Sequence, residues 1–211
     1  NYTINGAGSV DNLTGGGGND IITGKVGDDT LKGGAGNDTF NVDSGTDSIT
    51  DLGGSGAGGE SDILKVSGGA IANAINIKSF TATSDTQNLG STTLTAISTG
   101  GTINMSSASG SAIYTIIGGA GTDNLKGDDG NDIIKIVAST EGNSDTIDGD
   151  GGAANTLDVS SGTHVLTDNS KLLNIQNITL NNSTINLTNQ AEGFKITGGA
   201  GTDNITGGSG D

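Results

Sequence analysis

Residues 6–50 divide without a gap into five segments of nine residues: GAGSVDNLT, GGGGNDIIT, GKVGDDTLK, GGAGNDTFN and VDSGTDSIT. Each segment has an aspartate at its sixth position and an apolar residue at its eighth. The aspartates are Asp11, Asp20, Asp29, Asp38 and Asp47, and the apolar residues are Leu13, Ile22, Leu31, Phe40 and Ile49. A repeat of fixed length predicts a solenoid, in which each unit buries its apolar residues against its neighbours.

Further copies of the nonamer occur along the 211 residues. A looser copy, AGGESDILK, occupies 57–65 after a six-residue insertion, and GGAGTDNLK and GDDGNDIIK open a second array at 118. That array weakens through 140–148 and 150–158, and a third array starts at 198 with GGAGTDNIT. An aromatic residue (Tyr2, Tyr114 or Phe194) precedes each array by a few residues, which predicts two unequal modules and the start of a third within a longer chain.

The nonamer predicts a tight turn of about six residues followed by a strand of about three. Glycine permits left-handed backbone and close approach of carbonyl groups, and the chain contains 40 glycines. Asp outnumbers Glu by 21 to 3, which favours a short carboxylate held near the backbone of a turn. Because Ca²⁺ takes its ligands from carbonyl and carboxylate oxygens, these turns are candidate calcium sites.

Composition excludes several classes of protein. The net charge is −16 and every cation is a lysine, so nucleic acid is a poor partner. Cysteine is absent, which excludes disulfides, and no apolar run is long enough to span a membrane as a helix. Leu, Ile, Val and Phe make up about a fifth of the chain, near the range of disordered sequences. We therefore expect bound metal to contribute to folding.

The segments GGGGNDIIT, GGAGNDTFN, GGAGTDNLK and GGAGTDNIT match every fixed position of the pattern G-G-x-G-x-D-x-U-x, where U is apolar. This pattern resembles the RTX repeat, also known as the hemolysin-type calcium-binding repeat. The resemblance implies an all-β, right-handed parallel β-roll or β-helix solenoid with two nonamers per turn and multiple Ca²⁺ ions in its turns. Each ion is then expected between aspartates two nonamers apart: Asp11 with Asp29, Asp20 with Asp38, and Asp29 with Asp47.

The resemblance also implies a set of metal ligands, supplied by side chains or by backbone carbonyls. The candidates are Gly6, Gly8, Asp11, Gly15, Gly16, Gly17, Gly18, Asp20, Gly24, Val26, Gly27, Asp29, Gly33, Gly34, Ala35, Gly36, Asp38, Gly45, Asp47, Asp62, Gly118, Gly119, Ala120, Gly121, Asp123, Gly127, Asp129, Gly130, Asp132, Asp145, Gly198, Gly199, Ala200, Gly201 and Asp203. Some loops depart from the pattern. Lys25 replaces a glycine, and Asn155 replaces the aspartate of 150–158, so we expect that loop to be free of metal.

The stretches between the arrays lack the nonamer but contain apolar residues two apart, which predicts short half-buried strands. These pairs are Ile75/Ile77, Leu94/Ala96, Ile103/Met105, Ile178/Leu180, Ile185/Leu187 and Phe194/Ile196. We interpret the stretches as further solenoid turns closed by side-chain packing; flexible linkers are the alternative. The expected division is therefore a first RTX array at 1–66, a metal-poor β-solenoid segment at 67–113, a second array at 114–158, a second metal-poor segment at 159–193, and the start of a third array at 194–211.

Catalytic signatures are missing from the sequence. The one histidine, His164, cannot complete an H-E-x-x-H zinc motif, and its Gly-Thr-His-Val context predicts an exposed turn. Neither a nucleophile elbow nor a phosphate-binding loop is present. We expect no catalytic residues and no enzymatic activity.

Three functional classes fit this repeat pattern. The chain most resembles bacterial RTX surface-layer proteins, which lack cysteine, are poor in aromatic residues and alternate arrays with Thr-rich β segments. That resemblance implies a secreted, cell-surface structural protein exported by type I secretion. It also implies self-assembly into a layer or filament, with cell-surface polysaccharide as a further partner. The alternatives are the calcium-rigidified stalk of an RTX adhesin and the C-terminal secretion module of an exported hydrolase or toxin.

Overall fold

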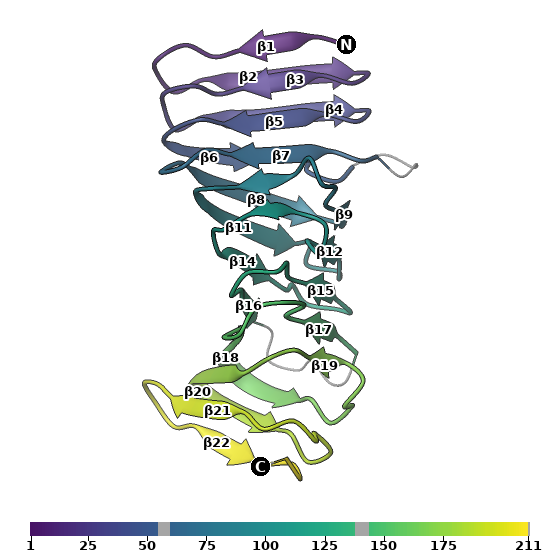
Figure 1. Ribbon diagram of the computed structural model, residues 1–211, viewed down its shortest axis with the longest axis vertical. Coiled ribbons are helices and arrows are strands. Elements are labelled where there is room, and N and C mark those ends of the chain that lie inside the picture. Colours follow the sequence, from purple (N-terminus) through teal and green to yellow (C-terminus); the bar gives the residue numbers. More distant parts are fainter. Residues whose placement is uncertain (55–59, 138–143, 211) are drawn as a thin grey trace.

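The computed structural model describes residues 1–54, 60–137 and 144–210, and its 22 strands form a single elongated stack (Figure 1). The strand pairings are parallel, and the chain winds through about nine turns of a β-solenoid. None of the described residues forms a helix, so none of them provides a long apolar helix that could cross a membrane. The all-β, parallel β-roll fold expected from the repeat is confirmed.

Three parallel sheets run along the stack. Sheet A contains β1 (Thr3–Asn5), β3 (Ile21–Thr23), β5 (Thr39–Val42), β7 (Ile63–Val66), β10 (Gln87–Asn88) and β13 (Ser109–Gly110). Sheet B contains β2 (Asn12–Gly17), β4 (Thr30–Ala35), β6 (Thr46–Ile49), β8 (Ile71–Ile77), β11 (Ser91–Ala96), β14 (Tyr114–Ile117), β16 (Ile133–Ile136), β18 (Thr156–Val165), β20 (Asn177–Asn186), β21 (Lys195–Gly198) and β22 (Asn204–Thr206). Sheet C contains β9 (Ser79–Thr81), β12 (Thr102–Asn104), β15 (Asn124–Lys126), β17 (Thr146–Asp148) and β19 (Leu172–Leu173).

In the first array the chain alternates between sheets A and B, so that two nonamers complete one turn. Leu13 pairs with Leu31 and Leu31 with Ile49, which places equivalent repeat positions above one another. On the opposite sheet Ile22 pairs with Phe40 in the same register. Because neighbouring turns are offset by two repeats, each repeat position lies beside the same position in the next turn.

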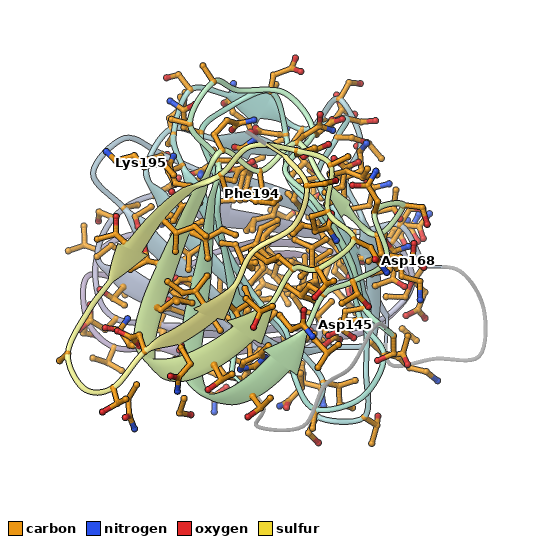
Figure 2. The ribbon with its side chains drawn as sticks, turned by 90° about the horizontal axis from the view of Figure 1, so that it is seen from below. Asp145, Asp168, Phe194 and Lys195 are labelled. Atoms are coloured by element: carbon orange, nitrogen blue, oxygen red, sulfur yellow. The ribbon has the colours of Figure 1, made fainter. Side chains whose placement is uncertain are left out.

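The core is a column of apolar side chains enclosed by the sheets, as the view along the stack shows (Figure 2). The eighth-position residues Ile22, Leu31, Phe40 and Ile49 have no exposed surface, whereas Leu13 near the N-terminal end is partly buried. Alternation along each strand produces this result, because successive side chains point to opposite faces of a sheet. The apolar interior is therefore narrow and continuous.

The stretches between the arrays continue the same solenoid. In the described part of 67–113 and throughout 159–193, strands of sheet B pair with the neighbouring arrays, as β11 does with β14 and β20 with β21. Strand β18 runs through the expected boundary at 158/159. Whether the five stretches act as separate units therefore stays a prediction.

The apolar pairs between the arrays point inward with one clear exception. Leu94, Ile103, Met105, Ile178, Leu180, Ile185 and Leu187 are buried, and Phe194 and Ile196 are partly buried. Ile75, however, is 41% exposed. Its neighbour Asn76 has φ of 60°, and the register with β11 shifts so that Ala96 pairs with Ile77. Ile75 follows the inward-facing Ala74 and therefore points outward, and the bulge at Asn76 returns Ile77 to the inward face, so the predicted inward position of Ile75 is wrong.

The cross-section changes midway along the stack, which the repeat did not predict. Sheet A ends at β13, whereas sheet C begins at β9 and continues to β19. From β8 to β13 the solenoid therefore has three sides, and from β14 to β19 sheets B and C enclose the core. Sheet B alone extends from β2 to β22 and is the continuous wall of the molecule.

Substitution in the apolar column tests the stack. Leu31→Ala is expected to lower the free energy of unfolding by about 2–5 kcal/mol, because it opens a cavity between two neighbouring turns. The matched control Leu89→Ala removes the same atoms from a residue that is 49% exposed, and about 0.5 kcal/mol is expected. Chemical denaturation in saturating calcium measures both changes, and equal losses would contradict the assignment of Leu31 to the core.

Candidate metal centre

The sixth-position aspartates of the first array form two rows on opposite edges of the roll. Turns that lead from sheet A to sheet B carry Asp11 and Asp29, with Asp47 at the start of β6 in the same row, and turns that lead back carry Asp20, Asp38 and Asp62. The two-nonamer turn produces this arrangement, because alternate repeats meet at the same edge. The three aspartate pairs expected to share an ion are therefore neighbours in these rows.

Each row is held by hydrogen bonds from backbone to carboxylate. The N–H of Asp11 donates to Oδ1 of Asp29 at 2.8 Å, and the N–H of Asp29 donates to Oδ1 of Asp47 at 3.0 Å. On the other edge the N–H of Asp20 donates to Asp38, and that of Asp38 donates to Asp62, both at 2.8 Å. One carboxylate oxygen of each acceptor is thus used within the protein.

For three of these aspartates the second carboxylate oxygen lies in a site that lacks a donor. Oδ2 of Asp20, Asp29 and Asp47 is buried and forms no hydrogen bond. A Cβ added to Gly24 would lie 2.5 Å from Oδ2 of Asp29 and 2.7 Å from Oδ2 of Asp47, so the two oxygens converge where that glycine has no side chain. Buried acceptors without a donor are costly unless a positive group satisfies them. These residues therefore fit a bound cation.

Backbone carbonyl oxygens of neighbouring turns also lie close to the glycines of these turns. Gly34 has φ of 105°, and a side chain there would overlap the carbonyl oxygen of Gly16 one turn earlier. Gly15 similarly lies against the carbonyl oxygen of Gly33 as well as Oδ2 of Asp20. In the part of the chain that the structure describes, no group of three or more His, Cys, Asp or Glu side chains could hold a metal. A cation here would therefore combine paired carboxylates with carbonyl oxygens, which is a donor set that Ca²⁺ accepts.

Burial and mutual repulsion raise the pKa of several of these carboxyls. Burial raises the pKa of Asp47 to about 6, neighbouring carboxylates including Asp29 add to this, and the hydrogen bond from the Asp29 N–H opposes it. Burial likewise raises the pKa of Asp62 and of Asp132 to about 6. Across the described residues of the first array, no lysine forms an ion pair with these aspartates. The one ion pair that these aspartates form among the described residues joins the N-terminal ammonium to Oδ1 of Asp20 at 3.8 Å, so the turns hold negative charge without a lysine to balance it.

The second array repeats this arrangement with modifications. The N–H of Asp123 donates to Oδ1 of Asp145 at 2.9 Å, and the N–H of Asp132 donates to Oδ1 of Asn155 at 2.8 Å. Oδ2 of Asp123 and of Asp132 each accepts an N–H of its own loop, from Gly119 and Asp128. These two carboxylates are therefore better satisfied than those of the first array.

The third array does not bring two aspartates together. Oδ1 of Asp203 accepts the N–H of Ser183 at 3.1 Å, and the turn of β20 that it faces carries Asn181 and Asn182 instead of a carboxylate. Residues 57–59 and 140–143 of the looser repeat copies lie outside the described residues. Which of the candidate ligands bind metal stays a prediction.

Two further features of the turns were not predicted. Asp51, from the insertion, accepts the N–H groups of Gly33 and Gly34, and Glu60, from the looser copy at 57–65, accepts that of Gly36 at 3.2 Å, so both provide carboxylates for the turn before them. Fifth-position side chains form a second row, in which Oδ1 of Asn19 accepts the N–H of Asn37 at 3.0 Å. The recurrent Asn at that position was a usable signal in the sequence.

His164 corrects the expectation of an exposed turn. It lies in β18 with no exposed surface, and its Nε2 is 2.9 Å from the carbonyl oxygen of Ser161. The Ser-Gly pair before it forms a left-handed bend at Ser161 and Gly162, after which the strand continues inward. The sequence correctly indicated a turn at Ser161 and Gly162. It did not indicate that the side chain of His164, in the strand after this turn, points into the core.

Acid should partly replace metal in stabilising the fold. Because the folded-state pKa of Asp47, Asp62 and Asp132 exceeds the ordinary value of 3.8, protonation stabilises the metal-free fold. This contribution is complete below about pH 4 and is lost as the pH rises through about 6. In chelator, we expect the β signal in circular dichroism to increase from pH 7 to pH 5, and less so in Asp47→Asn. An unchanged or weaker signal at pH 5 would contradict this assignment.

Comparison with known families agrees with this geometry. A family model described as the RTX calcium-binding nonapeptide repeat (4 copies) matches residues 14–49, 115–135 and 195–211, together about a third of the chain. No curated protein and no solved structure matches the chain. RTX nonapeptide repeats bind several calcium ions, and proteins that carry them are typically secreted. The matched blocks, the two-nonamer turn and the rows of buried aspartates together identify the arrays of this chain as RTX calcium-binding repeats.

Proposed function

We propose that this protein is a non-enzymatic extracellular structural element that folds on binding calcium and assembles with copies of itself into a bacterial surface layer or a related filament. The buried, donor-free Oδ2 atoms of Asp20, Asp29 and Asp47 carry the proposal. They mark places where the folded chain by itself is incomplete.

Charge supports the calcium dependence. Neighbouring strands in a sheet lie about 4.8 Å apart, so stacked turns bring like charges close together in a poorly solvated environment. The chain has 24 acidic and 8 basic residues, and its own cations cannot neutralise the rows. Calcium, when bound, supplies the positive charge that these oxygens lack. Binding energy then becomes folding energy, because the turns cannot stack at neutral pH without it.

The thin core supports the same conclusion. The apolar column is enclosed by strands of three or four residues in the first array, such as β3 and β5. Ordering so much glycine-rich backbone costs conformational entropy that a narrow column offsets poorly. Extracellular calcium-binding modules typically have dissociation constants of about 0.1–1 mM. A chain of this kind would therefore stay unfolded at cytosolic calcium levels and fold after export.

Shape supports the structural role. The molecule is a straight stack with one continuous sheet along its length (Figure 1). Solenoids of this kind present regular, extended surfaces and contact their surroundings through repeated side chains. Copies of the same chain are the proposed partner, and cell-surface polysaccharide is the proposed anchor. No reaction is proposed, because the described residues contain one histidine and it is buried in the core.

Substitution of a shared aspartate tests calcium-coupled folding. Asp29→Ala removes a carboxylate that faces both Asp11 and Asp47. We expect the variant to bind at least one calcium ion fewer and to need several-fold more calcium for half-maximal folding. The control Asp43→Ala removes an exposed carboxylate of the same edge and should retain the wild-type stoichiometry. Isothermal titration calorimetry and circular dichroism measure both, and equal behaviour of the two variants would exclude the proposed site.

Assembly is tested separately by electron microscopy and light scattering of the purified protein with calcium and with chelator. We expect ordered sheets or filaments in calcium and their loss in chelator. Folded monomers at high concentrations of protein and calcium would contradict self-assembly and would favour the adhesin stalk or the secretion module.

A further inference from the structure

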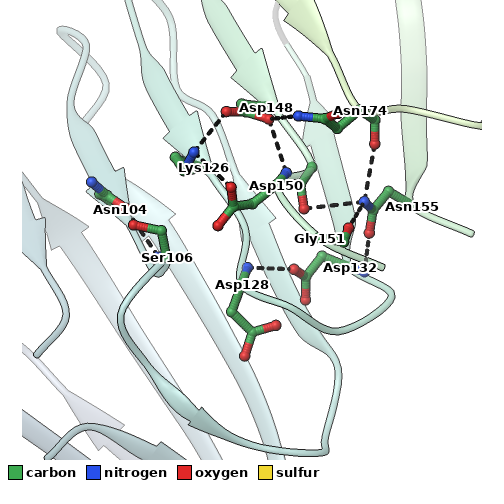
Figure 3. A network of polar contacts seen from close by, with 11 residues as sticks. Asn104, Ser106, Lys126, Asp128, Asp132, Asp148, Asp150, Gly151, Asn155 and Asn174 are labelled. Atoms are coloured by element: carbon green, nitrogen blue, oxygen red, sulfur yellow. Dashed lines mark hydrogen bonds and ion pairs between the residues drawn. The ribbon is translucent and has the colours of Figure 1, made fainter. Parts of the chain in front are cut away.

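The turn that ends in Asn155 differs from the aspartate turns of the first array in how its acceptors are satisfied (Figure 3). Asn155 occupies the sixth position of its repeat and has no exposed surface. Its Oδ1 accepts the N–H of Asp132 at 2.8 Å, which is the same bond that an aspartate forms elsewhere in the rows. The amide of Asn155 therefore keeps the backbone hydrogen bond that a carboxylate accepts at this position.

The amide nitrogen takes the place of the donor-free carboxylate oxygen. Nδ2 of Asn155 lies 3.1 Å from the carbonyl oxygen of Gly149 and 2.5 Å from that of Gly151, both in its own loop. It also lies 3.0 Å from the carbonyl oxygen of Asn174, one turn later. Three oxygens from two stacked turns thus surround one nitrogen. In the first array, oxygens of the same kind surround a space with no donor.

Nearby carboxylates are neutralised by the protein itself. Nζ of Lys126 lies 2.9 Å from Oδ2 of Asp148 and 2.7 Å from Oδ1 of Asp150, and Nδ2 of Asn174 donates to Oδ1 of Asp148 at 2.7 Å. This edge therefore has the positive and donor groups that the first array lacks.

Amides continue the row beyond Asn155. The N–H of Asn155 donates to Oε1 of Gln176 at 2.8 Å, and Nε2 of Gln190 donates to the carbonyl oxygen of Leu166 at 2.6 Å. Over the same part of the stack β18 and β20 pair at nine positions, more than any other two strands of the described chain. Side-chain amides and long strands therefore close the turns here.

From these contacts we propose that the turn 149–155 is a calcium site converted to a metal-free closure, in which Nδ2 of Asn155 holds the position that a cation takes in the aspartate turns. Two consequences follow, both resting on the proposed calcium role of those turns. The single substitution Asn155→Asp restores a calcium site. The stack around β18 and β20 also stays paired when calcium is removed, and serves as a folded base for the calcium-dependent arrays.

Calcium stoichiometry tests the first consequence. Asn155→Asp in the full chain is expected to bind one more calcium ion than the wild type and to lose stability in chelator at pH 7, because its carbonyl neighbours then face a carboxylate. The matched control is Asn104→Asp, which adds the same charge on β12 and keeps an acceptor for the N–H of Ser106. The control should leave the stoichiometry unchanged. An unchanged count in Asn155→Asp, or an equal gain in the control, would overturn the proposal.

Hydrogen exchange of the wild-type chain tests the second consequence without any substitution. After transfer to chelator, amides of 156–165 and 177–186 should remain protected, whereas those of Asp11, Asp20 and Asp29 should exchange rapidly. Uniform loss of protection would overturn the proposal even if Asn155→Asp does not fold. A wild type that binds no calcium would refute the proposed function itself. Calcium binding by the wild type without a gain in Asn155→Asp would refute only the assignment of this turn.

Discussion

The constraint on which the rest of the structure depends is the parallel register of two repeats per turn. It places identical residues directly above one another, so the same register that stacks Leu13, Leu31 and Ile49 also stacks Asp11, Asp29 and Asp47. Apolar columns gain from this repetition, whereas rows of carboxylates repel one another. An RTX turn reconciles the two by placing the acids at the edges, where carbonyl oxygens can share a cation with them.

The cost of that arrangement varies along the molecule. In the first array Oδ2 of Asp20, Asp29 and Asp47 has no donor, and burial raises the pKa of Asp47 and Asp62. In the second array backbone N–H groups satisfy Asp123 and Asp132, and at Asn155 an amide replaces the acid. The dependence on metal should therefore decrease toward β20, as donors from the protein replace the ion.

The change from sheet A to sheet C follows from the spacing of the turns. The register separation is 18 residues in the first array but 22 between β7 and β10 and 23 between β9 and β12. Extra residues add a third side to the cross-section between β8 and β13, after which the chain continues with sheets B and C. Sheet B lines the apolar column along the whole stack, whereas the opposite side of the column changes from sheet A to sheet C. Because sheet B is continuous, the metal-poor turns pack directly on the turns of the arrays.

The sequence by itself determined the repeat unit and the inward position of residues such as Leu31 and Phe40, and the RTX resemblance implied the two nonamers per turn that place aspartates along two edges. These features are set within nine residues, by glycine backbone freedom and by the two faces of a strand. Only the tertiary structure decided the burial of His164, the bulge at Asn76, the capping by Asp51 and Glu60, and the three carbonyl oxygens around Asn155. Each of these depends on a neighbour one turn away, and the intervening length varies from turn to turn, so no local pattern specifies which groups meet.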